Sequence, residues 1–380
     1  MLVLRRLFWN WEESDMVEIV ALESVCSFNR GRTITAKNAV KGEIPVIAGG
    51  QAPSYYHNEP NRIGESITIA GSGAYAGFVS YWNQPIYVSD AFTVDPSEKL
   101  IHKYLFHWLK MNQQKIFLTQ KGAGVPHVHG KDIANFQIPI PTIEVQTRIV
   151  EILDTFTSSI SNLKEQIKER RKQYEYYRDQ LLDLEGKDGV EMKTLGEIAK
   201  YRRGSFPQPY GNEEWYNGEG AMPFVQVADV EENGMKLKDL TKQFISTLAM
   251  PMSVFVPQGS IVVTLQGSIG KVAITQYDSY VDRTLGIFTG FLINIDKKYF
   301  AHQLLKIFSI KKKKARGGTI KTITKEEFSQ FAIPIPSKEE QLRIVSILDQ
   351  FEASIANLEA QLKEREKQYE YYRNQLLTFE

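Results

Sequence analysis

The chain has 380 residues, a formal net charge of +1 and a single cysteine, Cys26. Its length predicts two domains, each large enough for a hydrophobic core of its own. The near-balance of charge excludes a protein that binds nucleic acid through a general positive excess, so any contact with DNA must depend on local clusters of Lys and Arg. One cysteine excludes a disulfide framework, and no apolar run reaches the ~18 residues of a membrane span. We therefore expect a cytoplasmic protein without a membrane partner.

The chain opens with 16 aromatic-rich residues that we assign to no element. A segment that begins at residue 17 is repeated 173 residues later, because Leu22 matches Leu195 and Arg30-Gly31 matches Arg203-Gly204. Short β-branched and aromatic runs punctuated by Gly, Asn and Pro then predict strands, and an apolar stripe predicts a helix over residues 99–111. The expected strands are residues 44–47, 66–70, 77–82, 86–88 and 92–94. A glycine-rich loop, Lys121–Gly130, follows the helix.

Residues 136–185 return as residues 331–380 at a constant offset of 195, with 33 identities in 50 positions. A repeat this close predicts two copies of one structural part. Each copy starts with Phe-x-Ile-Pro-Ile-Pro, and we place these prolines at a helix entrance, where a missing N–H costs nothing. Thr142 and Ser337 share the N-cap position, and Ser337 with Glu340 predicts a complete capping box.

After each proline segment, apolar residues recur at alternating steps of four and three over five heptads, with charged residues and no Gly or Pro between them. This period predicts a coiled coil rather than a surface helix. The one polar position in each seam is an arginine, Arg170 or Arg365, and the seams extend to Leu184 and Phe379. The predicted seam residues are Ile149, Leu153, Phe156, Ile160, Leu163, Ile167 and Tyr174, and Ile344, Leu348, Phe351, Ile355, Leu358, Leu362 and Tyr369.

We expect the two long helices to pair with each other, antiparallel. Each is roughly 60 Å long at 1.5 Å per residue, whereas the segment between them makes a domain only about 30–40 Å across. Such a domain joins neighbouring helix ends more easily than distant ones. The alternative is that each helix pairs with a partner chain. The expected parts are a globular domain (1–142), a long helix (143–185), a second globular domain (186–336) and a second long helix (337–380).

The fold class expected from these parts is α+β. It has two mixed globular domains at opposite ends of an antiparallel two-helix coiled coil, related by a pseudo-two-fold internal repeat. The second domain follows a short polar linker and parallels the first, with strands at 259–264 and 271–274 and a helix at 299–310.

Four consecutive lysines at the end of that helix are the strongest cue to function. Such a run beside Gly-Gly suits contacts with phosphate, which need positive charge and a flexible approach; a solvated helix end would favour lysine as well. The matching glycine-rich loop of the first domain favours DNA contact. The candidate residues are Lys311, Lys312, Lys313, Lys314 and Arg316 in the second domain and Lys121, His127 and His129 in the first.

Further candidates lie in predicted loops or at strand edges. Arginine there suits guanine O6 and N7, and glutamine suits adenine, although a plain surface role is open for each of them. They are Arg30, Arg32, Arg202, Arg203, Gln266, Lys271 and Arg283. Tyr75, Tyr81 and Trp82 suit either base contacts or core packing, and we favour packing.

The sequence gives no sign of catalysis. His127-x-His129 has no third ligand at a recognised spacing, so we expect no metal. Neither Gly71-Ser72-Gly73 nor Gly267–Lys271 fits a phosphate-binding loop, and no hydrolase, zinc-protease, dinucleotide or amino-methyltransferase motif occurs. We expect no catalytic residue, no metal and no cofactor.

A glycine-rich loop, a Phe-x-Ile-Pro-Ile-Pro-x(2)-Glu-x-Gln-x-Arg-Ile-Val segment and a long helix, present twice, resemble the specificity (S) subunit of type I restriction–modification systems. The resemblance spans residues 17–380. It implies two target recognition domains (1–142 and 186–336) and no catalytic centre. The implied partners are double-stranded DNA, two methyltransferase (M) subunits and restriction (R) subunits. The motif residues are Phe136, Ile138–Pro141, Glu144, Gln146 and Arg148–Val150, and Phe331, Ile333–Pro336, Glu339, Gln341 and Arg343–Val345.

One departure lies in the glycine-rich loops, where the first has His127 and His129 and the second has Lys321 and Thr322. Paired DNA-binding units imply two half-sites separated by an unread spacer of fixed length, with the helices as the ruler. The segments Lys164–Lys172 and Glu359–Lys367 are candidate docking faces for M subunits. The alternatives are a coiled-coil interaction protein that binds other proteins, and a free-standing methyltransferase or nuclease, which the missing motifs disfavour.

Overall fold

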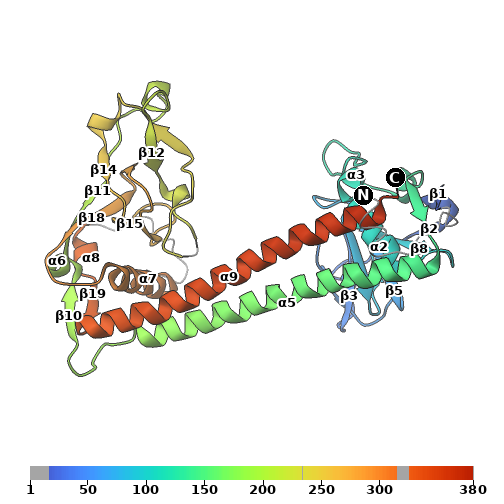
Figure 1. The fold of residues 1–380 in the computed structure, drawn as a ribbon, viewed down its shortest axis with the longest axis horizontal. Helices are drawn as coiled ribbons and strands as arrows, with labels where there is room; N and C mark the ends of the chain where they lie inside the picture. The colour runs from blue at the N-terminus through green and yellow to red at the C-terminus, as the bar shows by residue number, and fades with distance from the viewer. Residues whose placement is uncertain (1–16, 233, 315–324, 380) are drawn as a thin grey trace. The chain divides into compact units, whose positions relative to one another are not determined.

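The structure is a computed structural model that describes residues 17–232, 234–314 and 325–379. The chain divides into unit 1, which runs to Ile167 and resumes at Leu358, and unit 2, Lys168–Asn357. Helix α5 (Ile143–Leu181) begins in unit 1 and ends in unit 2, whereas α9 (Lys338–Leu377) begins in unit 2 and ends in unit 1. In each unit the beginning of one long helix therefore lies beside the end of the other (Figure 1), which confirms antiparallel pairing within the chain.

Unit 1 contains a four-stranded antiparallel sheet in the order β2-β8-β5-β6 and a three-stranded sheet in the order β4-β3-β7. In the smaller sheet β3 pairs with β7 in parallel. The strands are β2 (Cys26–Arg30), β3 (Ile44–Ile47), β4 (Tyr55–His57), β5 (Glu65–Ala70), β6 (Val79–Asn83), β7 (Tyr87–Val88) and β8 (Ala91–Pro96). The short helices are α2 (His102–Met111), α3 (Gln113–Phe117) and α4 (Gly130–Ile133).

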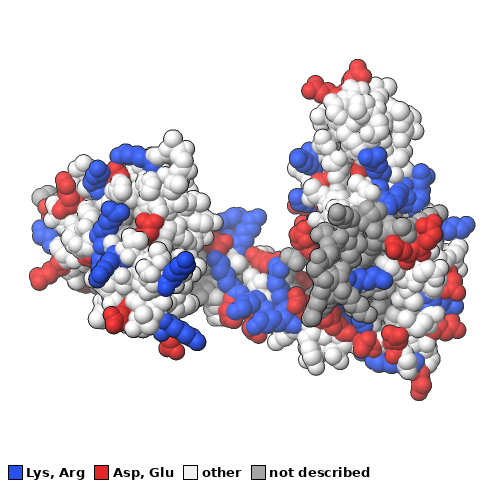
Figure 2. Space-filling model, turned by 180° about the vertical axis from the view of Figure 1, so that it is seen from behind, with Lys and Arg blue, Asp and Glu red and all other residues white. Residues whose placement is uncertain are grey.

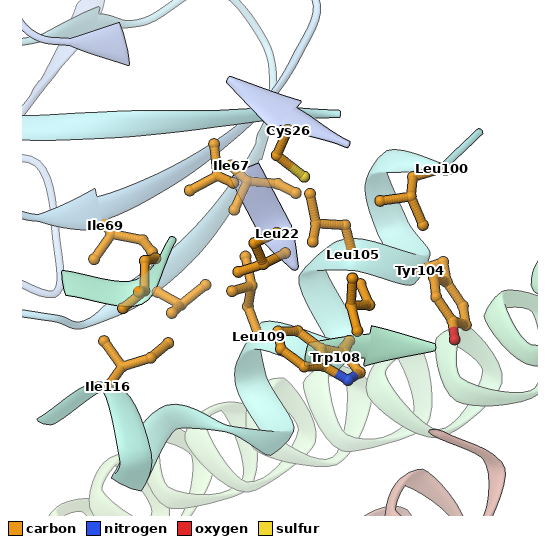
Figure 3. Packing of buried hydrophobic residues seen from close by; sticks show 14 of the residues in the cluster. Leu22, Cys26, Ile67, Ile69, Leu100, Tyr104, Leu105, Trp108, Leu109 and Ile116 are labelled. Carbon is orange, nitrogen blue, oxygen red and sulfur yellow. The ribbon is translucent and has the colours of Figure 1, made fainter. Parts of the chain in front are cut away.

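Helix α2 forms the core of unit 1 with one face. Tyr104, Leu105, Trp108 and Leu109 are buried, at the spacing of one helical stripe. Figure 3 shows Leu105 and Leu109 beside Leu22, next to Ile67 of β5, whereas Tyr104 lies farther along α2.

The long helices complete this core. Ile149 and Leu153 of α5 and Leu377 of α9 belong to the same buried cluster. Each fully buried side chain of this kind contributes roughly 1.5–3 kcal/mol. The core of unit 1 is therefore built from both ends of the chain.

Unit 2 follows the same plan with a larger body. Its sheet β11-β18-β15-β16 corresponds to the large sheet of unit 1, and a second four-stranded sheet has the order β13-β12-β17-β14, with β12 and β17 parallel. The strands are β11 (Ala199–Arg203), β12 (Met222–Val225), β13 (Gln243–Ile245), β14 (Val254–Val256), β15 (Ile261–Thr264), β16 (Val272–Ile274), β17 (Ser279–Val281) and β18 (Leu285–Phe291). The short helices are α6 (Leu195–Ile198), α7 (Lys297–Lys314) and α8 (Lys325–Ser329).

The core of unit 2 is formed by α7 against the large sheet and the long helices. Tyr299, Phe300 and Phe308 of α7 are buried with strand residues of β15, and Ile344 and Leu348 of α9 belong to the same cluster. These two α9 residues are the repeat counterparts of Ile149 and Leu153 in unit 1, so each body closes on the start of its own long helix.

The Ile-Pro-Ile part of each proline segment is a strand. Strand β9 (Gln137–Ile140) pairs with β1 (Glu18–Ala21), and β19 (Ala332–Ile335) pairs with β10 (Glu191–Thr194), each in a sheet of only two strands. Pro139 and Pro334 lie within these strands, which a two-stranded sheet permits because a residue facing away from the partner strand needs no N–H donor. Placement at a helix entrance was wrong for these two prolines, whereas Pro141 and Pro336 lie directly before the N-cap residues Thr142 and Ser337.

Buried polar contacts tie each proline segment to its body. The hydroxyl of Tyr104 donates to the carbonyl of Pro139 at 2.8 Å, and that of Tyr299 donates to Pro334 at the same distance. Gln146, fully buried, accepts from the Ile101 N–H at 2.9 Å and donates to the carbonyls of Lys99 and Pro141.

The second copy repeats the glutamine contacts. Gln341 accepts from the Asp296 N–H at 2.8 Å and donates to the Pro336 carbonyl at 2.9 Å. The glutamine of the repeated motif therefore fixes the start of each long helix to the chain just before α2 or α7.

The two long helices begin as expected and end earlier. Thr142 and Ser337 accept the N–H groups of Val145 and Glu340, as N-cap residues do. The capping box was wrong in part, because the Glu340 carboxylate accepts from Arg343 instead, at 2.7 Å.

Leu184 and Phe379 lie beyond the ends of α5 and α9 and are not positions of a helical seam. Leu184 is nevertheless buried, because the chain turns after Leu181 and packs it into the core of unit 2. In the segment that follows Leu184, Gly186 and Gly189 adopt positive φ angles, which glycine tolerates.

The arginine in each seam has a defined contact. In unit 1, Phe156 stacks on Tyr372 with ring centroids 5.2 Å apart, and the Arg365 guanidinium lies 5.6 Å from the Phe156 ring. In unit 2, Phe351 stacks on Tyr177 at 5.5 Å under Arg170. A guanidinium over an aromatic face is an attractive contact, so the polar position belongs to the packing. All fourteen predicted seam residues are buried or half-buried.

A polar junction joins each body to the long helices, and the two junctions differ. In unit 1, His107 contacts the Tyr369 hydroxyl and the Asp154 carboxylate, each at 3.0 Å. Its repeat counterpart in unit 2, His302, is fully buried, and neither ring nitrogen has a hydrogen-bond partner within the described residues.

The counterparts of Tyr369 and Asp154 in unit 2 are Tyr174 and Asp349, and neither is hydrogen-bonded to His302. Tyr174 donates to Glu352 at 3.1 Å, and Asp349 pairs with Lys298. Burial, together with the Lys298 charge, lowers the pKa of His302 to about 3. Across the ranges that the structure describes, no helix combines the length and apolar character needed to cross a bilayer.

Candidate nucleic-acid interface

One edge of the large sheet in unit 1 collects several candidate residues. Arg30 ends β2 opposite Phe92, and Ala70 ends β5 opposite Ala91, the first residue of β8. The ends of two strands and the start of the third therefore lie together. We call this the loop edge.

Unit 2 has the same loop edge. Arg203 ends β11 opposite Gly286, and Thr264 ends β15 opposite Leu285, the first residue of β18. Arg30 and Arg203, which match in sequence, thus occupy matching places.

The glycine of each Arg-Gly pair permits a close approach at the loop edge. The N–H of Gly31 donates to the Ala91 carbonyl at 2.9 Å, and a Cβ on Gly31 would lie 2.4 Å from the carbonyl oxygen of Ser89. Gly204 donates to Leu285, and its Cβ would lie 2.1 Å from the carbonyl oxygen of Val281. No side chain fits such gaps, so the glycine of the repeated Arg-Gly pair is a structural requirement of the edge.

In unit 1 the glycine-rich loop joins this edge. Ser72, after β5, forms a backbone bridge with His127, which also bridges Lys121. The Ser72 hydroxyl also contacts Asp90, in the turn that ends at β8. Arg30, Arg32, Lys121, His127 and His129 all have exposed side chains.

The loop carries a stacked histidine pair and one internal ion pair. The rings of His127 and His129 are stacked with centroids 6.3 Å apart. Lys121 contacts the Asp132 carboxylate. Burial alone would raise the pKa of Asp132, but the contacts from Lys121 and the His129 N–H outweigh it and lower that pKa. Lys121 is thus oriented while its side chain stays 71% exposed.

In unit 2 the loop edge brings Arg203, Arg283 and Gln266 together. Arg203 Nη1 donates to the Arg283 carbonyl at 3.4 Å. Leu265, next to Gln266, donates its N–H to the Thr284 carbonyl at 2.9 Å. Arg202 is exposed, and its Nε donates to the carbonyl of the adjacent Arg203 at 3.4 Å.

Lys271 lies in a different setting. Its side chain is 10% exposed, pairs with Glu232 and donates to the Val230 carbonyl at 3.3 Å. A lysine whose charge is already paired and whose side chain is only 10% exposed has little charge available for a phosphate. The structure therefore favours a packing role for Lys271.

Only part of the lysine run can be described. Lys311 is exposed, and its ammonium lies 4.2 Å from the centre of the Phe331 ring. The backbone of Lys312–Lys314 is the end of α7. The side chains of Lys312, Lys313 and Lys314, and all of Arg316 and Lys321, lie outside the described residues.

The three aromatic candidates differ from one another. Trp82 donates to Thr68 at 2.9 Å and Tyr81 packs against Phe106, in keeping with packing roles. Tyr75 is 46% exposed, so the expectation that it packs in the core was wrong. It lies in the turn before β6, where the chain leaves the sheet.

The loop edges offer exposed cations and amides on rigid strand ends. Such groups can contact phosphate oxygens and base edges. In residues 17–232, 234–314 and 325–379, no group of His, Cys, Asp and Glu is arranged to hold a metal. Figure 2 shows Lys and Arg mixed with Asp and Glu on the visible face of both bodies, as the net charge implies.

Several residues that shape these edges carry no motif in the sequence. In unit 2, Tyr210 contacts Asp282, which lies in the same turn as Arg283. In unit 1, Asp90 contacts Ser72. The junction residues His107 and His302 were also missed, although extending the alignment at offset 195 upstream of Phe136 would have paired them.

A family model described as the type I restriction modification DNA specificity domain matches residues 14–170 and again residues 187–367. The Escherichia coli type I restriction enzyme EcoR124I/EcoR124II specificity subunit is 34% identical over 303 residues, covering 74% of this chain and 72% of that protein. A putative type I restriction enzyme specificity subunit of Haemophilus influenzae is 27% identical over 394 residues and covers 97% of both chains.

The crystal structure of the S subunit of a type I restriction–modification system from M. genitalium has the same fold. It matches with a TM-score of 0.64 at 16% identity, over 98% of this chain and 99% of that one. The family model matches once on each side of the linker, in agreement with the two loop edges. The chain therefore belongs to the type I restriction modification DNA specificity family.

Proposed function

We propose that this chain is the DNA specificity subunit of a type I restriction–modification complex. In this role it reads a bipartite double-stranded DNA target, with the body of each unit as the target recognition domain for one half-site. The observation that supports this most is that one loop edge is built twice with different residues. Unit 1 carries Arg30-Gly31-Arg32 where unit 2 carries Arg203-Gly204-Ser205. A common scaffold with unlike surface residues suits two different half-sites.

The domain bounds that go with this proposal are 1–142 and 186–336 for the recognition domains, and 143–185 and 337–380 for the long helices. The cationic candidates at the loop edges would contact phosphates and base edges. Methyltransferase subunits, two per chain, would dock on the exposed faces of Lys164–Lys172 and Glu359–Lys367, and restriction subunits would join that complex. The chain would act in the cytoplasm without a catalytic centre, metal or cofactor of its own.

The first experiment is genome-wide mapping of DNA methylation in the native host, with the gene present and deleted. We expect one bipartite motif with a spacer of fixed length to lose its methylation on deletion. An unchanged methylome would contradict the proposal. A purified chain that methylates DNA without partners would instead favour an enzyme.

The second experiment measures affinity for DNA that contains the motif. A net charge of +1 predicts weak, salt-sensitive binding by the chain alone and strong binding with M subunits, because phosphate contacts set most of the affinity. Equal affinities in a gel-shift titration would contradict this. A stable homodimer without sequence-selective DNA capture would support the alternative coiled-coil interaction protein.

A further inference from the structure

The turn between β17 and β18 is one residue longer than its counterpart in unit 1. In unit 1, β7 ends at Val88 and β8 begins at Ala91, so two residues form the turn. In unit 2, β17 ends at Val281 and β18 begins at Leu285, so three residues form it. Both turns approach the glycine of the Arg-Gly pair, so they are equivalent. The longer turn contains an exposed arginine, Arg283.

Asp282 fixes the conformation of this turn. Its side chain is buried, and Oδ1 accepts the N–H of Thr284 at 2.9 Å and the Thr284 hydroxyl at 2.5 Å. Oδ2 accepts the hydroxyl of Tyr210, also at 2.5 Å. With three hydrogen bonds to one buried carboxylate, the backbone that carries Arg283 is held in place before any ligand arrives.

Tyr210 also restrains the arginine side chain. The Arg283 guanidinium lies 5.2 Å from the centre of the Tyr210 ring, a cation–π contact. The Tyr210 ring is itself held in place, because it stacks on the Phe206 ring with centroids 5.1 Å apart. The backbone carbonyl of Tyr210 also accepts the Tyr216 hydroxyl at 2.9 Å. Burial and the Asp282 contact raise the pKa of Tyr210 to about 12, so its hydroxyl remains a donor at neutral pH.

The neighbours of Arg283 complete a compact polar group. Arg203 donates to the Arg283 carbonyl, and the N–H of Leu265, just after β15, donates to the Thr284 carbonyl. A phosphate contact needs positive charge and tolerates a flexible side chain. A guanine contact needs the planar guanidinium fork in a set orientation, facing O6 and N7. A restrained fork loses less conformational entropy on binding, so this geometry favours base reading.

We propose that Arg283 reads a guanine in the half-site recognised by unit 2, with Tyr210 and Asp282 as positioning residues. This inference rests on the proposed function and deepens it. Unit 1 has Ser89 and Asp90 at the equivalent turn and no arginine there, so this reading is particular to unit 2.

The test maps methylation motifs in the native host carrying Arg283→Ala, Arg283→Lys or the control Lys200→Ala. Lys200 is an exposed lysine on the same strand as Arg203, away from the loop edge. We expect both Arg283 variants to lose about tenfold or more of the preference for G·C at one position of one half-site. The other half-site and the Lys200→Ala motif should be unchanged. Loss in Arg283→Lys, which keeps the charge, identifies the fork as the reading group.

Tyr210→Phe and Tyr210→Leu test the positioning role. Phe keeps the ring and removes the hydroxyl, so we expect a partial loss of preference at the same base pair. Leu removes the ring and should cause a larger loss there. A melting temperature of Arg283→Ala equal to that of the parent chain excludes misfolding as the cause.

The outcomes separate the inference from the function it rests on. If the parent chain supports no gene-dependent motif, the proposed function and this inference both fail. If the parent motif is present and Arg283→Ala leaves it unchanged, only the inference fails. A loss of binding spread evenly over all sequences, with a weaker salt dependence, would make Arg283 a phosphate contact and overturn base reading.

Discussion

His107 Nδ1 lies 3.0 Å from the hydroxyl oxygen of Tyr369, a residue 262 positions further along the chain. The same imidazole contacts Asp154 through its other nitrogen. One side chain of the first body is thereby hydrogen-bonded to both long helices. The counterpart in unit 2, His302, is buried without such partners among the described residues.

Leucine at these two matched positions should have opposite effects at pH 7.5. His107→Leu leaves the Tyr369 hydroxyl and one Asp154 oxygen without their partner, at a cost of roughly 1–3 kcal/mol. His302→Leu removes two buried nitrogen atoms that have no hydrogen-bond partner among the described residues, so we expect no loss or a gain of up to about 1 kcal/mol. Calorimetry on both variants checks this. Equal destabilisation would show that His302 has a partner that the structure does not reveal.

The stability of unit 2 should depend on pH through His302. Its pKa is lowered to about 3 in the folded chain, whereas an unfolded histidine titrates near 6.5. Below about pH 6.5 the unfolded state binds a proton that the folded state does not, so folding stability falls as pH falls towards 3.

We expect His302→Leu to remove this loss, so that its stability relative to the parent chain rises by roughly 1–2 kcal/mol between pH 8 and pH 5. Melting temperatures across that range are the measurement. A difference that does not change with pH would contradict the assignment.

The glycines of the Arg-Gly pairs should not tolerate a methyl group. Gly31→Ala and Gly204→Ala each place a Cβ within 2.4 Å of a backbone oxygen. We expect a loss of about 2 kcal/mol or more from each unit. Under the proposed function, each variant should weaken recognition of its own half-site only.

Gly124→Ala in unit 1 and Gly211→Ala in unit 2 are the controls, because nothing lies within 4 Å of either added Cβ. These should melt within about 0.5 kcal/mol of the parent chain. If the single variant Gly31→Ala lost recognition of both half-sites, the cause would be a general folding defect rather than a local one.

The long helices should determine the spacer of the proposed target. Residues 163–169 and 358–364 are matching heptads of the repeat. Removing both shortens each helix by about 10 Å, which corresponds to about three base pairs. Because these heptads overlap the proposed docking faces Lys164–Lys172 and Glu359–Lys367, the measurement is the affinity of the purified chain for DNA targets with spacers of different lengths. We expect recognition of both half-sites to persist and the preferred spacer to shorten. Removal from one helix only should break the pairing and lower the melting temperature. An unchanged spacer in the double deletion would refute the ruler.

The long helices were predictable because their signal is local and duplicated. A heptad seam can be seen in any short window, and the repeat shows it twice. The arginines Arg170 and Arg365 appeared as exceptions in that pattern. Their contacts with Phe351 and Phe156 come from the opposite helix, which no local window contains.

The proline segments show where local reading failed. Proline before a long helix suggested a helix entrance, but Pro139 lies in β9 and pairs with Ile19 of β1, about 120 residues earlier. Strand pairing over such separations depends on tertiary contacts rather than local propensity. In the second body, none of β12, β13, β14 and β17 was predicted.

The candidate interface was predictable in part. The Arg-Gly match at offset 173 located both loop edges, because a glycine that the backbone requires is the same residue in both copies. Lys271 looked similar to the other cations, and only the structure reveals its pairing with Glu232. Asp282 and Tyr210 carry no motif, since their role depends on a contact across 72 residues.

The core that closes around Leu22 includes Leu377, close to the last residue of the chain. During synthesis, the core of the first body therefore stays incomplete until the residues around Leu377 have been made. A stop codon shortly before Leu377 would leave the body of unit 2 encoded and would remove a core residue from the body of unit 1.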